Sequence, residues 1–208
     1  MDYADRRVLA VCMVSATALI VSGIAPYDRL TWLMEIMPVL LALPVLVFTR
    51  TRFPLTTLVY ALIVIHGLIL IYGGAYTYAR TPFGFWLQDL LGFMRNPYDR
   101  IGHLAQGFVP AMVAREVLLR VFRIRGRNIL FFLVICICLA ISAFYELIEW
   151  WAALLIGAGA DEFLATQGDV WDTQWDMFMA LVGALAAQWL LGRWHDLQIS
   201  RLDRSKEP

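Results

Sequence analysis

Charged residues are scarce in this sequence, and neither sign prevails. Asp, Glu, Lys and Arg make up 16% of the chain, with 17 residues of each sign, so the formal net charge is zero. Without a basic excess there is no overall electrostatic attraction to nucleic acid. We therefore expect no nucleic-acid partner.

Cysteine is also rare, and its three occurrences, Cys12, Cys136 and Cys138, all lie inside apolar runs. On a helix, Cys136 and Cys138 point in different directions, because each residue turns by about 100°. We interpret all three as small hydrophobic residues rather than as metal ligands or disulfide partners. Internal repeats and low-complexity segments are missing as well.

The chain is instead rich in apolar residues, which make up 61% of it and give a mean hydropathy of +0.67. In a typical soluble domain the apolar share is roughly 45–50%. Apolar runs of about 17–25 residues are long enough to span a bilayer. We therefore predict an all-α, polytopic integral membrane protein with about six transmembrane helices. The expected spans are Val8 to Ile24, Trp32 to Phe48, Pro54 to Gly74, Ile101 to Val121, Ile129 to Ile156, and Thr173 to Leu191.

These spans predict a single transmembrane helical domain over residues 1–208, with a short flexible tail at 197–208. Thirteen of the 17 Lys and Arg residues lie at the helix ends that include both termini. Arg29, Arg80, Arg95 and Arg100 are the four at the other ends. Because short cytoplasmic loops carry the excess of Lys and Arg, we expect a multi-pass membrane protein with both termini in the cytoplasm.

The unusual polar residues on the expected spans all fall on the opposite, outer side. Pairs three or four residues apart share one helical face. A charge inside a membrane helix costs about 2.5–3.5 kcal/mol on insertion scales, so such residues are candidates for function. The residues that converge, one histidine among them, are Glu35, Asp99, His103, Glu146, Glu149, Asp172 and Asp176.

Carboxylates together with an imidazole suit a divalent metal such as Mg, Mn, Zn or Fe, and helical bundles build metal sites from inward-facing Glu, Asp and His residues. Either His103 or Glu149 is the expected general base. Arg100 and His103 are the only obvious counter-charges, and like charges at low dielectric cannot all stay ionised. A metal, shared protons or a cationic substrate must balance them. The candidate ligands are Asp99, His103, Glu146, Glu149, Asp172 and Asp176.

Plainer roles stay open for some of these residues. Asp99 stands where a helix is expected to begin and could act as a cap, as could Asp169 or Asp172. Asp172 and Asp176 could also serve to complement the helix dipole, and His103 could be a polar contact between helices. The two glutamates could form interhelical hydrogen bonds, for instance with His66 or Gln106. We interpret His66 itself as a polar packing residue.

Three further segments have structural interpretations. Gly102 and Gly107 favour close helix packing rather than phosphate binding. The aromatic segment Phe85 to Met94 predicts a short interfacial helix, which is either a simple anchor or a lid over the outer site. The arginines from Arg115 to Arg127 are typical of a cytoplasmic loop that attracts anionic lipid.

Two stretches, YDRIGHLAQGFVPAMVAREVLLR and AISAFYELIEWWAALLIGAGADEFLATQGDVWDTQWDMFMALVGA, resemble the YjdF family of predicted inner-membrane proteins. That resemblance implies an inner-membrane location, but the family has no established biochemical activity.

A more distant similarity is to the VanZ-like membrane proteins, in the pattern formed by Asp99, His103, Glu149 and Asp172 or Asp176. The present sequence departs from it by the extra Glu146 and by two tryptophans after Glu149. The similarity suggests a role in the cell envelope.

Three functions follow as hypotheses. The protein is a membrane-embedded enzyme that uses a divalent metal on a lipid or lipid-linked envelope substrate, a proton- or cation-coupled transporter, or a non-catalytic envelope component. The missing repeats and the scarcity of charge in the inner halves of the helices argue against transport. Substrate, metal and oligomeric state stay open.

Overall fold

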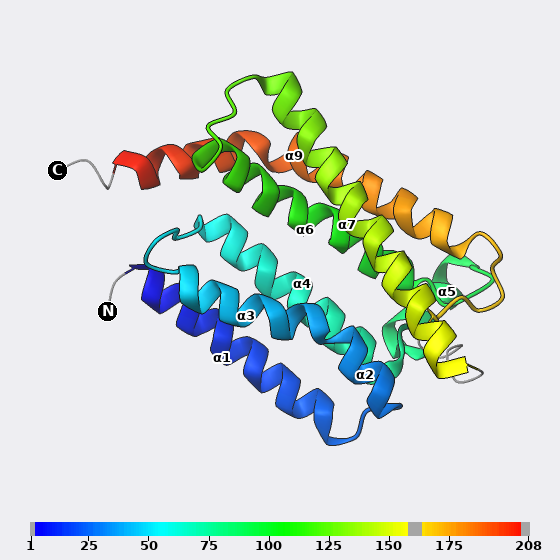
Figure 1. Ribbon diagram of the computed structural model, residues 1–208. Coiled ribbons are helices and arrows are strands. Elements are labelled where there is room, and N and C mark those ends of the chain that lie inside the picture. The colour runs from blue at the N-terminus through cyan, green and yellow to red at the C-terminus, as the bar shows by residue number, and fades with distance from the viewer. Residues whose placement is uncertain (1–2, 158–163, 205–208) are drawn as a thin grey trace.

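The computed structural model describes residues 3–157 and 164–204, and every regular element in these ranges is a helix (Figure 1). The all-α prediction is therefore confirmed. In chain order the elements are α1 (Tyr3–Ile24), α2 (Arg29–Glu35), α3 (Met37–Thr49), α4 (Thr57–Tyr76), the 3-10 turn η1 (Tyr78–Arg80), α5 (Pro82–Leu91), α6 (Tyr98–Arg120), α7 (Arg127–Ile156) and α9 (Asp172–Arg204).

Among the described residues, four helices are long and apolar enough to cross a bilayer, namely α1, α4, α7 and α9, and the bent pair α2–α3 brings the number to five. Large apolar side chains such as Phe48, Leu155 and Trp189 are exposed on their outer faces, as expected for surfaces in contact with lipid. The count of about six spans is not confirmed. The remaining candidate, Ile101 to Val121, overlaps most of α6, which is not among the helices that are apolar enough to cross a bilayer.

The second expected span is broken at Ile36, where α2 and α3 meet at an angle of 40°. Pro38 stands in the first turn of α3, where a residue without an N–H is tolerated. Asp28 caps α2, because its carboxylate accepts a hydrogen bond of 2.7 Å from the backbone N–H of Thr31. That bond lowers the pKa of Asp28. The break places Glu35, the last residue of α2, in a buried position.

Helix α6 is the central element, which packs against α4, α7 and, most extensively, α9. Two glycines bring the backbones of α6 and α9 into contact. A Cβ atom on Gly107 would overlap the carbonyl group of Ala180, and one on Gly183 would overlap the carbonyl oxygen of Leu104. A Cβ on Gly102 would lie 2.7 Å from the ring of Tyr78. The close-packing interpretation of Gly102 and Gly107 is therefore confirmed.

Figure 1 shows which segments share an end of the bundle. The described ends of the chain lie together with the α3–α4 and α6–α7 connections, and we call this the arginine-rich end after Arg50, Arg120 and Arg127. Helix α5 and the first turns of α6 and α9 lie at the opposite end. We call it the acidic end after Asp99 and Asp172.

Two expectations concern the segments at these ends. The interfacial helix expected at Phe85 to Met94 forms as α5, three residues earlier than predicted at both ends, with Trp86 and Leu90 exposed. Residues 197–204, expected in a flexible tail, continue α9 as a helix, and residues 205–208 lie outside the described ranges. That the chain forms one domain stays a prediction.

Candidate functional site

Six polar side chains come together at the acidic end from four helices, and we call them the acidic cluster. All are buried except Glu149, which is half-buried. Helices α6 and α9 start at this end, α7 finishes there, and α2 stops there at its break, so residues far apart in sequence converge. The members are Glu35 of α2, Asp99 and His103 of α6, Glu146 and Glu149 of α7, and Asp176 of α9.

Asp99, His103 and Asp176 form the tightest group within this cluster, with one ligand atom of each inside 4.8 Å of the others. Nε2 of His103 lies 3.5 Å from Oδ1 of Asp99 and 3.8 Å from Oδ1 of Asp176. The other ring nitrogen, Nδ1, lies 3.1 Å from Oε1 of Gln106. Because an amide oxygen only accepts hydrogen bonds, Nδ1 must carry a proton when that bond forms. The imidazole therefore points Nε2 at both aspartates.

Two oxygen atoms of the cluster lack a hydrogen-bond partner within the described ranges, although both are buried. They are Oδ2 of Asp99 and Oε1 of Glu146. The latter lies 3.9 Å from Nδ1 of His103, beyond hydrogen-bond distance. The backbone N–H at the start of α6 bonds to Oδ1 of Asn96, not to Asp99. Asp99 is therefore not a cap, and its second oxygen is available for another ligand.

Asp172 is placed differently from the other candidate ligands. Arg95 contacts its Oδ1 at 2.6 Å and Arg100 contacts the same atom at 2.9 Å. Arg100 also bonds to Asp169 at 3.0 Å and to Asp176 at 2.5 Å. The expectation that Arg100 and His103 were the only local counter-charges was wrong, since Arg95 also neutralises this group. The role of Arg95 could not be predicted from the sequence, because this residue lies in the loop before α6, five residues before Arg100.

Asp169 closes a turn just before α9, and the capping role that was left open between it and Asp172 is not shown for either residue. Oδ1 of Asp169 accepts a hydrogen bond of 2.9 Å from the backbone N–H of Trp171. Asp172 is thus an ion-pair residue in this structure, and Asp176 alone connects the arginine pairs to His103.

A small cavity of about 160 Å³ opens beside the acidic cluster. Glu35, Asp99, His103 and Glu149 line it, together with Tyr145, whose hydroxyl donates a hydrogen bond of 3.3 Å to Glu35. No residue of α5 is among the lining residues of the described chain, which favours the anchor interpretation of α5 over the lid.

Tyr78 and Tyr145 also line this cavity and were not predicted from the sequence. Gln106 lines it too and was named only as a candidate hydrogen-bond partner of the glutamates. Thr77 and Tyr78 adopt left-handed backbone conformations, with φ of 55° and 31°. This turn presses the Tyr78 ring against Gly73 and Gly102. Tyrosine and glutamine are common in interfacial and helix-packing positions, so only the fold distinguishes these three.

The cavity adjoins a larger, almost wholly apolar groove of about 610 Å³ between α3, α4, α6 and α7. Pro38, His66, Leu70, Pro110 and Ile141 line both spaces. Nε2 of His66 is buried there and has no hydrogen-bond partner among the residues that the structure describes. The expected bond from His66 to the α7 glutamates is therefore not made.

A second buried polar group lies at the arginine-rich end, and the sequence analysis did not predict it. Glu116 is fully buried and accepts hydrogen bonds from the backbone N–H and the hydroxyl of Thr56, at 3.0 Å and 2.8 Å. It also contacts Arg120, and its Oε2 lies 2.9 Å from Nε2 of His195. We call Thr56, Glu116, Arg120 and His195 the Glu116 cluster.

The Glu116 cluster extends to the surface through Arg115, which lies 3.2 Å from His195 and 2.6 Å from Asp196. The statement that the inner halves of the helices are nearly uncharged was therefore wrong. Arg115 and Arg120 were interpreted as part of a topological charge run. The available signal was Glu116 itself, an acid four residues before Arg120 inside an apolar run.

Comparisons with known proteins agree with a membrane protein. Residues 7–197 match the family model described as "Predicted membrane protein (DUF2238)". The chain is 57% identical over 183 residues to the inner membrane protein YjdF of Escherichia coli strain K12, an alignment that covers 88% of each chain. No solved structure matches. The resemblance to the YjdF family is thereby confirmed, and the more distant similarity to VanZ-like proteins stays untested.

Proposed function

Given that the chain belongs to the family of predicted membrane proteins DUF2238, we propose that it is a membrane-embedded enzyme that uses a divalent metal at its acidic end on a lipid or lipid-linked envelope substrate. The observation that carries this proposal is the group formed by Asp99, His103 and Asp176, whose ligand atoms lie within 4.8 Å of one another beside a cavity.

The arrangement around His103 supports a metal ligand rather than a buried cation. Metal-bound histidines usually donate their second ring N–H to an oxygen, which fixes the tautomer, and Gln106 stands in that position. The two aspartates supply hard oxygen ligands, and Oδ2 of Asp99 has no other partner in the described chain. Glu146 adds an oxygen on the far side of the ring. Two carboxylates and one imidazole suit Mn, Fe or Zn.

The proposed reaction assigns a separate role to the metal ion, to Glu149 and to Asp172. A divalent ion polarises an ester or phosphoryl oxygen and lowers the pKa of a bound water. His103 is occupied as a ligand, so Glu149, which lines the cavity without a hydrogen bond to a described residue, is the proposed general base. Asp172 serves as a positioning residue, because it anchors the Arg100 guanidinium that also holds Asp176.

The adjoining groove favours a lipid over a soluble substrate. It continues from the polar cavity along α3 and α6 towards the arginine-rich end and is lined almost only by apolar side chains. A substrate with one polar head and a hydrocarbon chain would place the head beside His103 and the chain in the groove. A small polar substrate would leave this apolar surface unused.

Metal analysis of the purified protein tests the proposal. We expect about one divalent ion per chain, loss of thermal stability with chelator, and recovery with Mn or Zn. His103→Gln and Asp99→Asn should abolish binding, whereas Asp89→Asn, which changes an exposed acid of α5, should not. The proposal of a metal-dependent enzyme would be overturned if the protein bound no ion and its melting temperature did not change with chelator or added metals.

Transport is the second candidate, and one observation favours it. Buried charged groups lie at both ends of the bundle, with His66 in between. The scarcity of charge in the inner halves of the helices therefore no longer argues against a polar path for transport. Proteoliposomes decide between the two: a pH- or cation-driven flux that depends on both Glu116 and His103 supports the transporter. No flux, combined with metal-dependent turnover of lipid extracts, supports the enzyme.

We also propose an orientation in the bacterial inner membrane, with both termini and the arginine-rich end in the cytoplasm. The asymmetry of Lys and Arg supports it. A reporter that is active only outside the cytoplasm should work when fused at Phe85 of α5 and fail when fused at Arg123. The reverse pattern would move the acidic end to the cytoplasm and exclude an outer-face substrate.

A further inference from the structure

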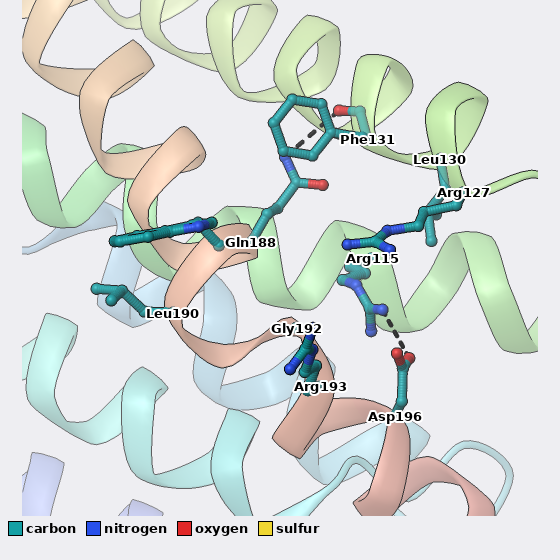
Figure 2. A pocket seen from close by; sticks show the side chains of 10 residues that line it. Arg115, Arg127, Leu130, Phe131, Gln188, Leu190, Gly192, Arg193 and Asp196 are labelled. Atoms are coloured by element: carbon teal, nitrogen blue, oxygen red, sulfur yellow. Dashed lines mark hydrogen bonds and ion pairs between the residues drawn. The ribbon is translucent and has the colours of Figure 1, made fainter.

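A pocket at the arginine-rich end combines unpaired positive charge with an apolar wall. It has a volume of about 630 Å³ and lies between α6, α7 and α9. Figure 2 shows Arg115, Arg127 and Arg193 around it, one from each helix. Arg115 is paired with Asp196 at 2.6 Å. Arg127 and Arg193 have no hydrogen-bond or ion-pair partner in the part of the chain that the structure describes.

The charge of the lining favours an anion. Three arginines face one aspartate, which leaves an excess of two positive charges in one pocket. Helix α7 also begins here, at Arg127, and its N-cap Gly126 offers no side chain to the first backbone N–H groups. The positive end of a 30-residue helix adds to the attraction for a phosphate or carboxylate.

The apolar part of the lining favours a lipid. Phe131 of α7 and Trp189 and Leu190 of α9 form one wall, and they are 40%, 83% and 59% exposed on membrane-spanning helices. Trp189 lies one helical turn before Arg193, where the apolar part of α9 passes into a stretch with charged residues, and tryptophan is typical of such boundaries at the headgroup level. A free anion would make no use of this wall, whereas a phospholipid would pack its first methylene groups on it.

We propose that this pocket binds the phosphate of an anionic phospholipid from the leaflet at the arginine-rich end. Arg127 and Arg193 hold the phosphate, and Arg115 is kept in place beside them by Asp196 and His195. Basic pockets between transmembrane helices are known to select anionic headgroups. This site is separate from the acidic cluster and does not depend on the proposed enzyme activity.

Lipid titration of the delipidated protein in neutral detergent tests the proposal, with bound lipid counted by native mass spectrometry. The probes are phosphatidylglycerol, zwitterionic phosphatidylethanolamine and inorganic phosphate. We expect saturable binding of phosphatidylglycerol, and a loss of about tenfold or more in affinity for Arg127→Gln combined with Arg193→Gln. Both residues are exposed, so the unfolding temperature without lipid should be unchanged, and Arg193→Gln alone should show a smaller loss.

The matched control is Arg125→Gln combined with Arg201→Gln, which removes the same charge from exposed positions at the same end, outside the pocket. This pair should keep its affinity within about twofold. An equal loss in both pairs would show diffuse surface attraction and overturn the pocket. Binding of inorganic phosphate that is as strong as that of phosphatidylglycerol would overturn the lipid assignment.

Discussion

Two buried polar clusters in the described part of this protein, one towards each end of α6, differ in how completely their polar atoms are hydrogen-bonded. In the Glu116 cluster, the carboxylate meets two donors from Thr56, the Arg120 guanidinium and His195. In the acidic cluster, five carboxylates surround a single histidine, and Oδ2 of Asp99 and Oε1 of Glu146 have no hydrogen-bond partner within the described ranges. The charged groups of the acidic cluster also line a cavity.

This difference separates a structural group from a candidate site. Buried polar atoms in folded proteins are nearly always paired, and a fully connected network fixes one arrangement of the helices. An incompletely paired group of like charges destabilises the fold, so its persistence calls for a ligand. The Glu116 cluster therefore holds α4, α6 and α9 together, while the acidic cluster is the proposed site for a cation or substrate.

Removal of Glu116 should give the largest effect. Glu116→Ala leaves Arg120 and His195 buried without their acceptor, and breaking a buried ion pair costs about 3–5 kcal/mol. We expect low expression and a strongly reduced melting temperature in detergent. Asp196→Ala is the control, because its side chain is 57% exposed and a surface pair contributes about 0–1 kcal/mol. Equal losses in the two variants would remove the structural interpretation of the Glu116 cluster.

A substitution between the two clusters tests whether α6 positions both of them. Gly107→Ala places a Cβ against the Ala180 carbonyl group, and overpacking costs typically 1–3 kcal/mol. As α6 and α9 separate, His103 and Asp176 should move apart, so divalent-cation affinity should fall together with stability. Gly192→Ala, on α9 where a Cβ meets nothing within 4 Å, should change neither. Reduced stability with normal cation binding would mean that the acidic cluster tolerates this displacement.

The sequence predicted the acidic cluster well and the Glu116 cluster not at all, for a physical reason. Asp99 and His103 lie one turn apart on α6, and Glu146 and Glu149 lie one turn apart on α7. The shared face within each pair follows from the helix period, and the convergence of the two pairs follows from the order of the spans. Glu116 depends on Thr56 and His195, which are 60 and 79 residues away in sequence. No periodicity connects such positions. Arginines near a loop satisfy the topology rule whether or not they are buried.

The break between α2 and α3 was missed for a related reason. An apolar run of sufficient length predicts one span, and Pro38 inside it is tolerated in many membrane helices. Packing decides the outcome: Trp32 donates a hydrogen bond to Ser22 of α1 at 3.0 Å, and α2 also packs on α4. The bend is what brings Glu35 to Tyr145 at the cavity.

Glu149→Gln gives the smallest change in stability and the sharpest test of the acidic cluster. Glu149 is half-buried and makes no hydrogen bond or ion pair with a described residue, so an amide of the same shape loses no partner. Because a repulsive charge disappears, we expect a free energy of unfolding that is unchanged or higher by about 1–2 kcal/mol. The affinity for a divalent cation should fall, since one negative charge leaves the shared cavity, and any lipid turnover should cease.

Glu35→Gln is the comparison, because Glu35 accepts a hydrogen bond from Tyr145 and its amide has to reorganise that contact. Melting temperature and cation affinity, measured together by calorimetry, separate the two roles. A Glu149→Gln protein that is destabilised and still binds its cation normally would make Glu149 a packing residue and place the acidic cluster beside the Glu116 cluster as a structural group.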